Sequence, residues 1–234
     1  MKPKTLSIDL ETYSSVDIGK CGVHRYVESP DFEILLFSYS TDYGPVRLVD
    51  LAQGEVIPEE VVEWLYDPDV EKTAFNAAFE RTCLSRHFNR YCVPEQWDCT
   101  MILAAQCGLP MSLAGVSLAL GLPEDKAKMK EGKELIRYFC VPCKPTKVNG
   151  GRTRNMYSDA PEKWSTFRDY NIRDVEAENE IRKRLLKWRP DESEHALWCI
   201  DQRMNDKGVR IDRLLAENAI NIGDKYREEL LTEY

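Results

Sequence analysis

Two carboxylates near the start of the chain, Asp9 and Glu11, have a type and spacing suited to binding a cation. They lie at the end of a predicted strand over residues 4–10, and side chains two residues apart on a strand point to the same face. Two negative charges held this close repel each other unless a cation lies between them. Carboxylate oxygens are hard ligands that suit magnesium or manganese. The pair therefore indicates a metal site, although two solvated acids at a strand end would give the same pattern.

Three residues later in the chain could complete such a site: Glu80, Tyr170 and Asp174. Glu80 follows a predicted strand over 70–75 and would lie in the first turn of a helix that Asn76 could cap. Tyr170 and Asp174 are four residues apart on a predicted helix, so they share one face. A solvated helix surface would explain each of these residues taken singly. The case for a shared site rests on the combination of these residues and on their order along the chain.

The elements that must position these side chains follow from hydrophobic periods and turn signals. Short connections join predicted strands at 4–10, 32–40 and 44–51, which indicates an antiparallel meander. A fourth strand is expected at 70–75, and helices are expected at 58–66, 77–91, 98–107, 112–120, 129–139, 161–188, 191–206 and from 212 onward. This order predicts an α/β fold in which a mixed sheet is flanked by helices.

The composition is that of a folded, acidic chain of 234 residues, with 43% apolar residues and a net charge of −8. It excludes wholesale disorder and a uniformly basic nucleic-acid-binding surface. No apolar run approaches the ~18 residues of a membrane span, and charge arrives too early for a secretory signal. We therefore expect no membrane partner. The eight cysteines are expected to be reduced thiols in a cytoplasm, bacterial or of a phage-infected host.

One segment of the chain is strongly basic. Residues 126–154 contain nine Lys and Arg residues and two Glu residues, so this segment carries +7 while the rest of the chain carries −15. Its second half belongs to a predicted long loop over 140–160, which is rich in proline, glycine and asparagine. Such a segment could bind a polyanion, although a solvated face and a loose loop would give the same charge run.

Three motifs, taken in order, resemble those of the DEDD 3′–5′ exonucleases. They are D-x-E-T beginning at Asp9, N-x-x-F-E ending at Glu80 and Y-x-x-x-D ending at Asp174. The tyrosine four residues before the last aspartate is typical of the DEDDy subgroup, which has a ribonuclease H-like fold. Residues 1–190 are similar to the exonuclease domain of phage-type family A DNA polymerases. The helical segment 191–234 resembles the start of the polymerase region in that family.

This resemblance implies hydrolysis of the terminal phosphodiester with two divalent metal ions, magnesium or manganese. It implies that the metal ligands are Asp9, Glu11, Glu80 and Asp174. It also implies that Tyr170 orients the nucleophilic water. The implied substrate is single-stranded DNA or a frayed primer 3′ end, the product is a nucleoside 5′-monophosphate, and the implied partner is a DNA polymerase region. Contacts to the substrate are expected from Thr12 and Asn76, and strand-tracking contacts from the basic loop residues Lys144, Lys147, Arg152 and Arg154.

One position departs from the family pattern. The second motif usually ends in aspartate, whereas this chain has Glu80, whose carboxylate lies one methylene further from the backbone. Two alternatives to a proofreading exodeoxyribonuclease therefore stay open. The fold could be a weakened exonuclease that serves as a single-strand-binding or structural module. It could also be an exoribonuclease, against which the polymerase-like segment argues.

Overall fold

The computed structural model describes residues 2–122, 132–189 and 191–233 of the chain. It divides into two compact units, Met1–Cys199 and Ile200–Tyr234, and the first unit holds the sheet and the candidate site. The domain boundary at 190/191 that the resemblance implies stays a prediction. Within the described residues, no helix is both long and apolar enough to cross a membrane.

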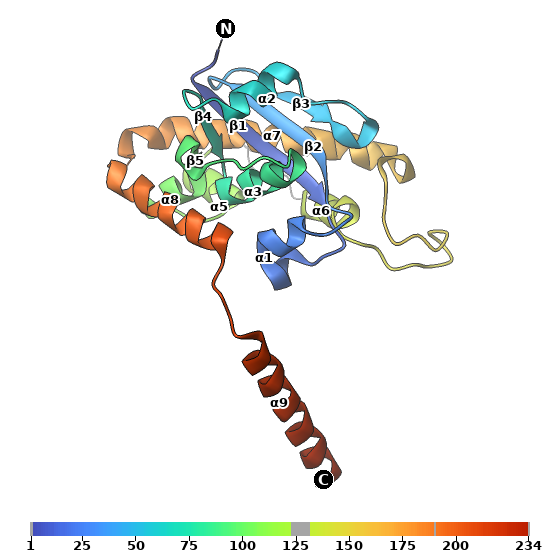
Figure 1. The fold of residues 1–234 in the computed structure, drawn as a ribbon. Coiled ribbons are helices and arrows are strands. Elements are labelled where there is room, and N and C mark those ends of the chain that lie inside the picture. Colours follow the sequence, from blue (N-terminus) through green and yellow to red (C-terminus); the bar gives the residue numbers. More distant parts are fainter. Residues whose placement is uncertain (1, 123–131, 190, 234) are drawn as a thin grey trace. The chain divides into compact units, whose positions relative to one another are not determined.

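A five-stranded mixed sheet forms the centre of the first unit (Figure 1). Its spatial order is β3-β2-β1-β4-β5, and the strands are β1 Thr5–Tyr13, β2 Glu33–Thr41, β3 Arg47–Asp50, β4 Glu71–Ala74 and β5 Trp97–Cys99. The first three strands pair antiparallel, which confirms the predicted meander, and β4 and β5 then add in parallel to β1. The sequence analysis missed β5, because two of its three residues lie where a helix is predicted at 98–107.

Most of the observed helices lie close to the ranges predicted from the sequence. In the described residues they are α1 Ile18–Val27, α2 Glu59–Tyr66, α3 Ala77–His87, α4 Thr100–Gln106, α5 Leu113–Ala119, α6 Gly132–Phe139, α7 Pro161–Leu185, α8 Glu192–Lys207 and α9 Arg213–Glu233. The sequence analysis missed α1, whose backbone is interrupted at Gly22 with a φ of 74°. Part of the helix predicted at 129–139 lies outside the described residues, as do the basic residues Lys126, Lys128 and Lys130.

One face of the sheet is apolar and packs against α1, α2 and α3. Leu6, Ile8 and Leu10 of β1 point to this face and are at most 5% exposed, in agreement with the predicted alternation. They share one cluster with Tyr26 of α1 and Leu84 of α3, among other residues. Burying aliphatic side chains of this size contributes about 1.5–3 kcal/mol each. The alternate residues of β1 therefore have to point to the opposite face.

The opposite face is covered by α7, which crosses behind the sheet in the view of Figure 1. This contact contains hydrogen bonds as well as apolar packing. Asn179 of α7 donates from Nδ2 to the Ser40 hydroxyl at 2.9 Å, and both residues are buried. Arg182 is fully buried and pairs with Asp98 at 2.7 Å and with Glu71 at 3.1 Å. These contacts fix α7 over the face to which Asp9 belongs, since Ser7 opposite Ser40 and Asp9 opposite Ser38 share one side of the β1–β2 ladder.

Candidate active site

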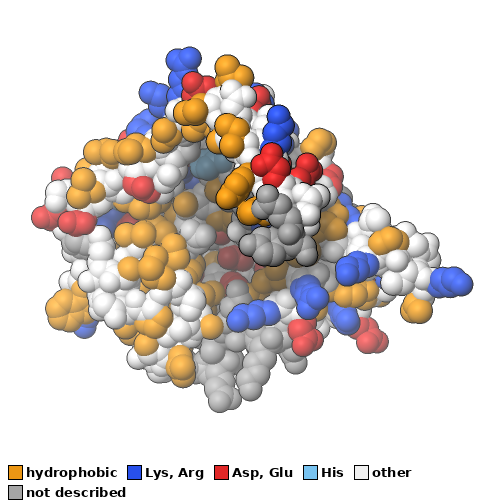
Figure 2. Space-filling view, turned by 90° about the horizontal axis from the view of Figure 1, so that it is seen from below, with side chains coloured by type: hydrophobic (Ala, Val, Ile, Leu, Met, Phe, Trp, Pro, Cys, Tyr) orange, Lys and Arg blue, Asp and Glu red, His pale blue; other side chains and the backbone are white. Residues whose placement is uncertain are grey.

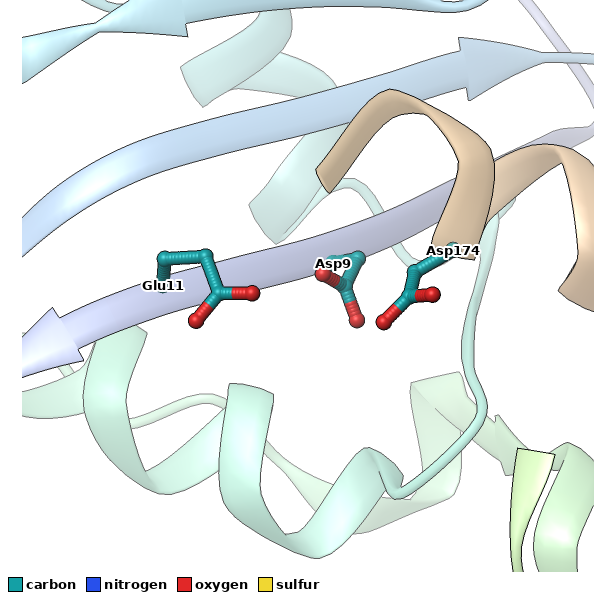
Figure 3. Close-up of side chains that lie close together, drawn as sticks. All are labelled: Asp9, Glu11 and Asp174. Carbon is teal, nitrogen blue, oxygen red and sulfur yellow. The ribbon is translucent and has the colours of Figure 1, made fainter. Parts of the chain in front are cut away.

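Three carboxylates converge where β1 faces α7. Asp9 and Glu11 project from one face of β1, and Asp174 projects toward them from α7 (Figure 3). One ligand oxygen from each of these residues lies within 4.8 Å of the other two. Two positions of one strand and one position of a helix far along the chain thus supply a single acidic cluster. The structure brings together three of the four residues that the sequence analysis proposes as metal ligands.

The chemistry of this cluster fits a divalent cation. Glu11 is 7% exposed and Asp174 is 5% exposed, so water screens their charges poorly. Carboxylates held this close in a partly buried place destabilise the fold when all are ionised, unless a cation or protons offset the repulsion. Oxygen ligands of this kind are the ones that magnesium and manganese prefer. Asp9, Glu11 and Asp174 would therefore hold a divalent metal ion.

The cluster lies in a cavity of about 640 Å³. This volume is in the range of small-ligand sites, which is about 300–1,000 Å³. Figure 2 shows a hollow on one face of the molecule with acidic side chains inside it and Lys and Arg side chains gathered along one side. The predicted site residues that line the cavity are Asp9, Glu11, Thr12, Asn76, Glu80 and Asp174, and its apolar residues include Phe75, Phe79, Leu113, Ile136 and Val141. The cavity thus combines an acidic floor with apolar walls.

Glu80 lines this cavity, but it is not one of the three carboxylates within 4.8 Å of one another. It is only 4% exposed, and its Oε2 has no hydrogen-bond partner in the described part of the chain. Burial raises the pKa of the Glu80 carboxyl well above its ordinary value, and the nearby charge of Asp9 raises it further. A buried carboxylate in this position needs a proton or a cation.

Asn171 contacts the acidic cluster and was missed in the sequence analysis. Its Nδ2 donates to Asp9 Oδ2 at 2.6 Å, and the residue is fully buried. Such a bond fixes the orientation of a carboxylate that would otherwise rotate, in the way that outer residues orient metal ligands. The available signal was its place within the Y-x-x-x-D motif, directly after Tyr170, but sequence alone cannot say which side chain it reaches.

Tyr170 is fully buried one helical turn before Asp174, and it is not among the residues that line the cavity. Its ring stacks on Phe167, with 6.3 Å between the ring centroids. The other constraint is α6, because a methyl group added to Gly132 would lie 2.1 Å from Cε2 of the ring. The tyrosine ring is therefore fixed by Phe167 and by the close approach of a glycine.

The side chains of the other residues near the acidic cluster differ in their hydrogen bonds. Thr12 and Tyr26 share a hydrogen bond of 2.9 Å between their hydroxyl oxygens. Asn76 is at the N-terminal end of α3, but its side chain makes no capping hydrogen bond there. Cys140, a further residue that the sequence analysis did not assign, lies with Sγ 3.7 Å from Glu11 Oε2. Burial raises the pKa of the Cys140 thiol well above its ordinary value, and Glu11 raises it further, so the sulfur stays protonated and donates to the carboxylate.

The basic loop is partly bound to the rest of the protein. Arg154 pairs with Glu33, and its guanidinium lies 3.7 Å from the centroid of the Tyr13 ring. Arg152 pairs with Asp159 at 3.1 Å. No ion pair links the side chains of Lys144 and Lys147 to any residue that the structure describes. The four predicted substrate contacts of this loop thus differ, because the fold engages the two arginines whereas the two lysines face solvent.

The fold and the acidic cavity define a class of protein. Among solved structures, the chain is similar to Escherichia coli RNase D, an exoribonuclease involved in structured RNA processing, with a TM-score of 0.54 and 17% identity, covering 88% of this chain and 46% of the other. It is also similar to Brucella melitensis NrnC, with a TM-score of 0.54 and 15% identity, covering 87% and 82%. The chain therefore has the ribonuclease H-like exonuclease fold that the sequence predicts.

A curated protein narrows this class. The chain is 54% identical over 230 residues to the DNA polymerase of Bacillus phage SP02, which covers 98% of this chain. The chain spans 35% of the length of that relative. No protein-family model matches the chain. The predicted resemblance to part of a phage DNA polymerase is thereby confirmed.

Proposed function

We propose that this chain is a divalent-metal-dependent 3′–5′ exodeoxyribonuclease that releases nucleoside 5′-monophosphates from DNA 3′ ends. The convergence of Asp9, Glu11 and Asp174 within 4.8 Å, in a cavity of nucleotide-compatible size, carries this proposal. The fold supports an exonuclease. The much higher identity to a DNA polymerase than to an RNase, 54% against 17%, favours DNA as the substrate and proofreading as the role.

In this proposal the acidic residues hold two divalent metal ions, magnesium or manganese. When bound, such ions offset the charge of the phosphate and lower the pKa of water. Asp9, Glu11 and Asp174 supply the clustered oxygens, and Asn171 keeps Asp9 oriented toward them. Glu80 would supply a further carboxylate from the cavity wall.

Substrate is held by residues around this cluster. Thr12 and Asn76 line the cavity and would contact the 3′-terminal nucleotide, whose base would lie against the apolar walls. The family resemblance assigns orientation of the attacking water to the Tyr170 hydroxyl, on a ring that Phe167 and Gly132 hold in place. This hydroxyl is buried outside the cavity lining, so it would have to become exposed to the cavity for that role. An unpaired end would reach the cavity more readily than a paired one, because unpairing a base costs a few kcal/mol. This difference is the physical basis of proofreading.

The partner in this proposal is a DNA polymerase region. The relative is a DNA polymerase of which this chain spans 35%. The helical segment 191–234 resembles the start of such a region. We therefore propose that residues 1–190 act as the exonuclease domain, working on 3′ ends that a polymerase has extended.

The test is a gel assay on a 5′-labelled single-stranded DNA with magnesium, manganese or EDTA, next to an RNA of the same sequence. A metal-dependent descending ladder on DNA, lost in Asp174→Asn, would support the proposal. Glu176→Gln is the matched control, since it removes a charge two residues away on α7 and lies outside the cavity lining. A ladder that persists in Asp174→Asn would refute the assigned site, and faster cleavage of RNA would assign an exoribonuclease.

The single-strand-binding alternative has one observation in its favour, the buried Glu80 in place of the usual aspartate. Tight binding of the strand without metal-dependent cleavage would favour it. Glu80→Asp then separates the two cases. If Glu80→Asp cleaves DNA where the unmodified chain does not, the extra methylene of Glu80 is the cause of the missing activity.

A further inference from the structure

Glu11 lies at an irregularity of β1. In the antiparallel ladder with β2, Glu11 lies opposite Leu36. Its neighbour Thr12 lies opposite Ile34 rather than Leu35, so the register shifts at this point. A register shift of this kind bends the strand and changes the direction of the side chains beside it. A glutamate side chain also has several rotatable bonds, and fixing them costs free energy. The backbone of β1 therefore leaves the direction of the Glu11 carboxylate to be fixed by side-chain contacts.

Cys140 makes such a contact from another part of the chain. Its Sγ donates to Glu11 Oε2 at 3.7 Å. The thiol is buried and lines the acidic cavity, so this contact lies beside the space in which a cation would bind. Asp9 has an equivalent donor, because Asn171 bonds to it at 2.6 Å. Asp9 and Glu11 are thus each oriented by a neighbouring donor that is not itself among the clustered carboxylates.

The position of Cys140 is itself fixed. It follows α6 directly, and its backbone N–H donates to the Ile136 carbonyl oxygen at 2.8 Å, which continues the helical bonding. α6 is held in turn by Phe139, whose ring stacks on Phe167 of α7 with 5.3 Å between the ring centroids. The same helix α7 carries Asp174. The helix that supplies one proposed metal ligand therefore also helps to place the donor to another.

We propose that Cys140 is a positioning residue for metal binding, whose thiol holds the Glu11 carboxylate in the orientation that ligates a divalent cation. This inference rests on the proposed function, because it takes Glu11 as a metal ligand. Replacing a residue that bonds to a metal ligand from outside typically lowers metal affinity by ~10–100-fold. A thiol is a weak donor and 3.7 Å is a long contact, so Cys140 is expected at the lower end of this range.

The test measures the affinity of the chain for Mn²⁺ alone, from the electron paramagnetic resonance signal of the free ion, without DNA. Cys140→Ala removes the donor and should weaken Mn²⁺ binding by ~10-fold. Cys140→Ser is close to the alanine variant in size but keeps a donor, so its affinity should stay within about twofold of that of the unmodified chain. Cys92→Ala is the control, because it removes another buried thiol that lies outside the cavity lining. It should leave Mn²⁺ affinity unchanged even if it lowers Tm.

A second comparison shows whether Cys140 acts through Glu11. In a Glu11→Gln background, Cys140→Ala should weaken Mn²⁺ binding by no more than about twofold, because the carboxylate that it orients is already gone. Equal losses in Cys140→Ala and Cys140→Ser, no loss in either, or an equal loss with and without Glu11 would overturn the inference. An unmodified chain that binds no Mn²⁺ would overturn it as well.

Failure of the proposed function gives a different result. An unmodified chain that binds Mn²⁺ but cleaves no DNA would refute the exonuclease. The comparison of alanine with serine at position 140 would then still decide whether Cys140 positions Glu11 for the metal ion.

Discussion

Gly132→Ala is expected to inactivate the enzyme by displacing Tyr170. The added methyl carbon would lie 2.1 Å from Cε2 and 2.7 Å from Cδ2 and Cζ of the ring. Carbon atoms in contact prefer about 3.5–4.0 Å. Either the ring or α6 must therefore move by about 1.4 Å. The ring is fully buried and stacked on Phe167, so no open space receives it.

The magnitude follows from that displacement. Overpacking of a filled core costs about 1–3 kcal/mol, and a chain of this size loses about 2–4 °C in Tm for each kcal/mol. A misplacement of about 1 Å near the reacting atoms lowers the rate by ~100-fold. We expect Gly132→Ala to stay folded at 25 °C with a lower Tm and with metal-dependent cleavage reduced by about that factor.

The assay measures Tm by circular dichroism and single-turnover cleavage of labelled DNA at 25 °C. Gly223→Ala is the control, because nothing lies within 4 Å of its added methyl group and it is inside α9. It should leave both quantities unchanged or raise Tm slightly. If Gly132 acts through Tyr170, then Tyr170→Phe should cost much less in the Gly132→Ala background than alone. Full activity with an unchanged Tm, or additive losses in the double variant, would refute this reasoning.

Three further perturbations test other contacts. Asn171→Ala should raise the magnesium concentration that gives half-maximal cleavage by about 10–100-fold, because Asp9 loses the donor that orients it. An unchanged magnesium titration of the cleavage rate would contradict this. Arg182→Met should lower the free energy of unfolding by about 1–3 kcal/mol in urea titrations, because it removes a fully buried cation from Asp98 and Glu71 and leaves them Arg189 as their remaining arginine among the described residues. A loss smaller than about 0.5 kcal/mol would argue against the pairing. Burial lowers the pKa of Lys72 from 10.5 to about 8, so the fold disfavours the charged form of this side chain. Between pH 8 and pH 10.5 the unfolded chain therefore binds more protons than the folded chain, and stability rises with pH. We expect the free energy of unfolding of the unmodified chain to rise relative to that of Lys72→Met by up to about 3 kcal/mol across this range. Urea titrations of both proteins at pH 7 and pH 10 measure this difference, and a difference that does not change with pH would contradict it.

The part of the fold that local patterns encode could be predicted from the sequence. The alternation of Leu6, Ile8 and Leu10 with polar residues fixes which face of β1 is apolar, and Asp9 and Glu11 then follow on the other face. The short connection between β2 and β3 predicts their antiparallel pairing, because two strands joined by a tight turn have few other ways to pair. The pairing of β1 with β2 spans a longer connection that contains α1. The parallel addition of β4 and β5 depends on contacts between distant residues, and β5 is too short for a periodic signal.

The candidate site shows the same division between local and distant information. Motif order predicted Asp9, Glu11 and Asp174 as a set, and the structure brings their carboxylates together. The roles of Asn171 and Gly132 could not be predicted, because each depends on a contact across more than 30 residues of chain between α7 and β1 or α6. Which substrate atoms Thr12, Asn76 and the basic loop contact stays a prediction.

The hydrogen-bonded contact between α7 and the sheet has a consequence for engineering. Apolar side chains would let a helix settle at several positions on a sheet with similar energy, whereas the Asn179–Ser40 bond and the Arg182 pairs require particular atoms to meet. A slip of one helical turn, about 5.4 Å, would carry Asp174 out of reach of Asp9. Replacing these polar residues with well-packed apolar ones could therefore raise the melting temperature and still scatter the carboxylates. Attempts to stabilise this protein should leave the buried polar residues of α7 intact and begin at its outer surface.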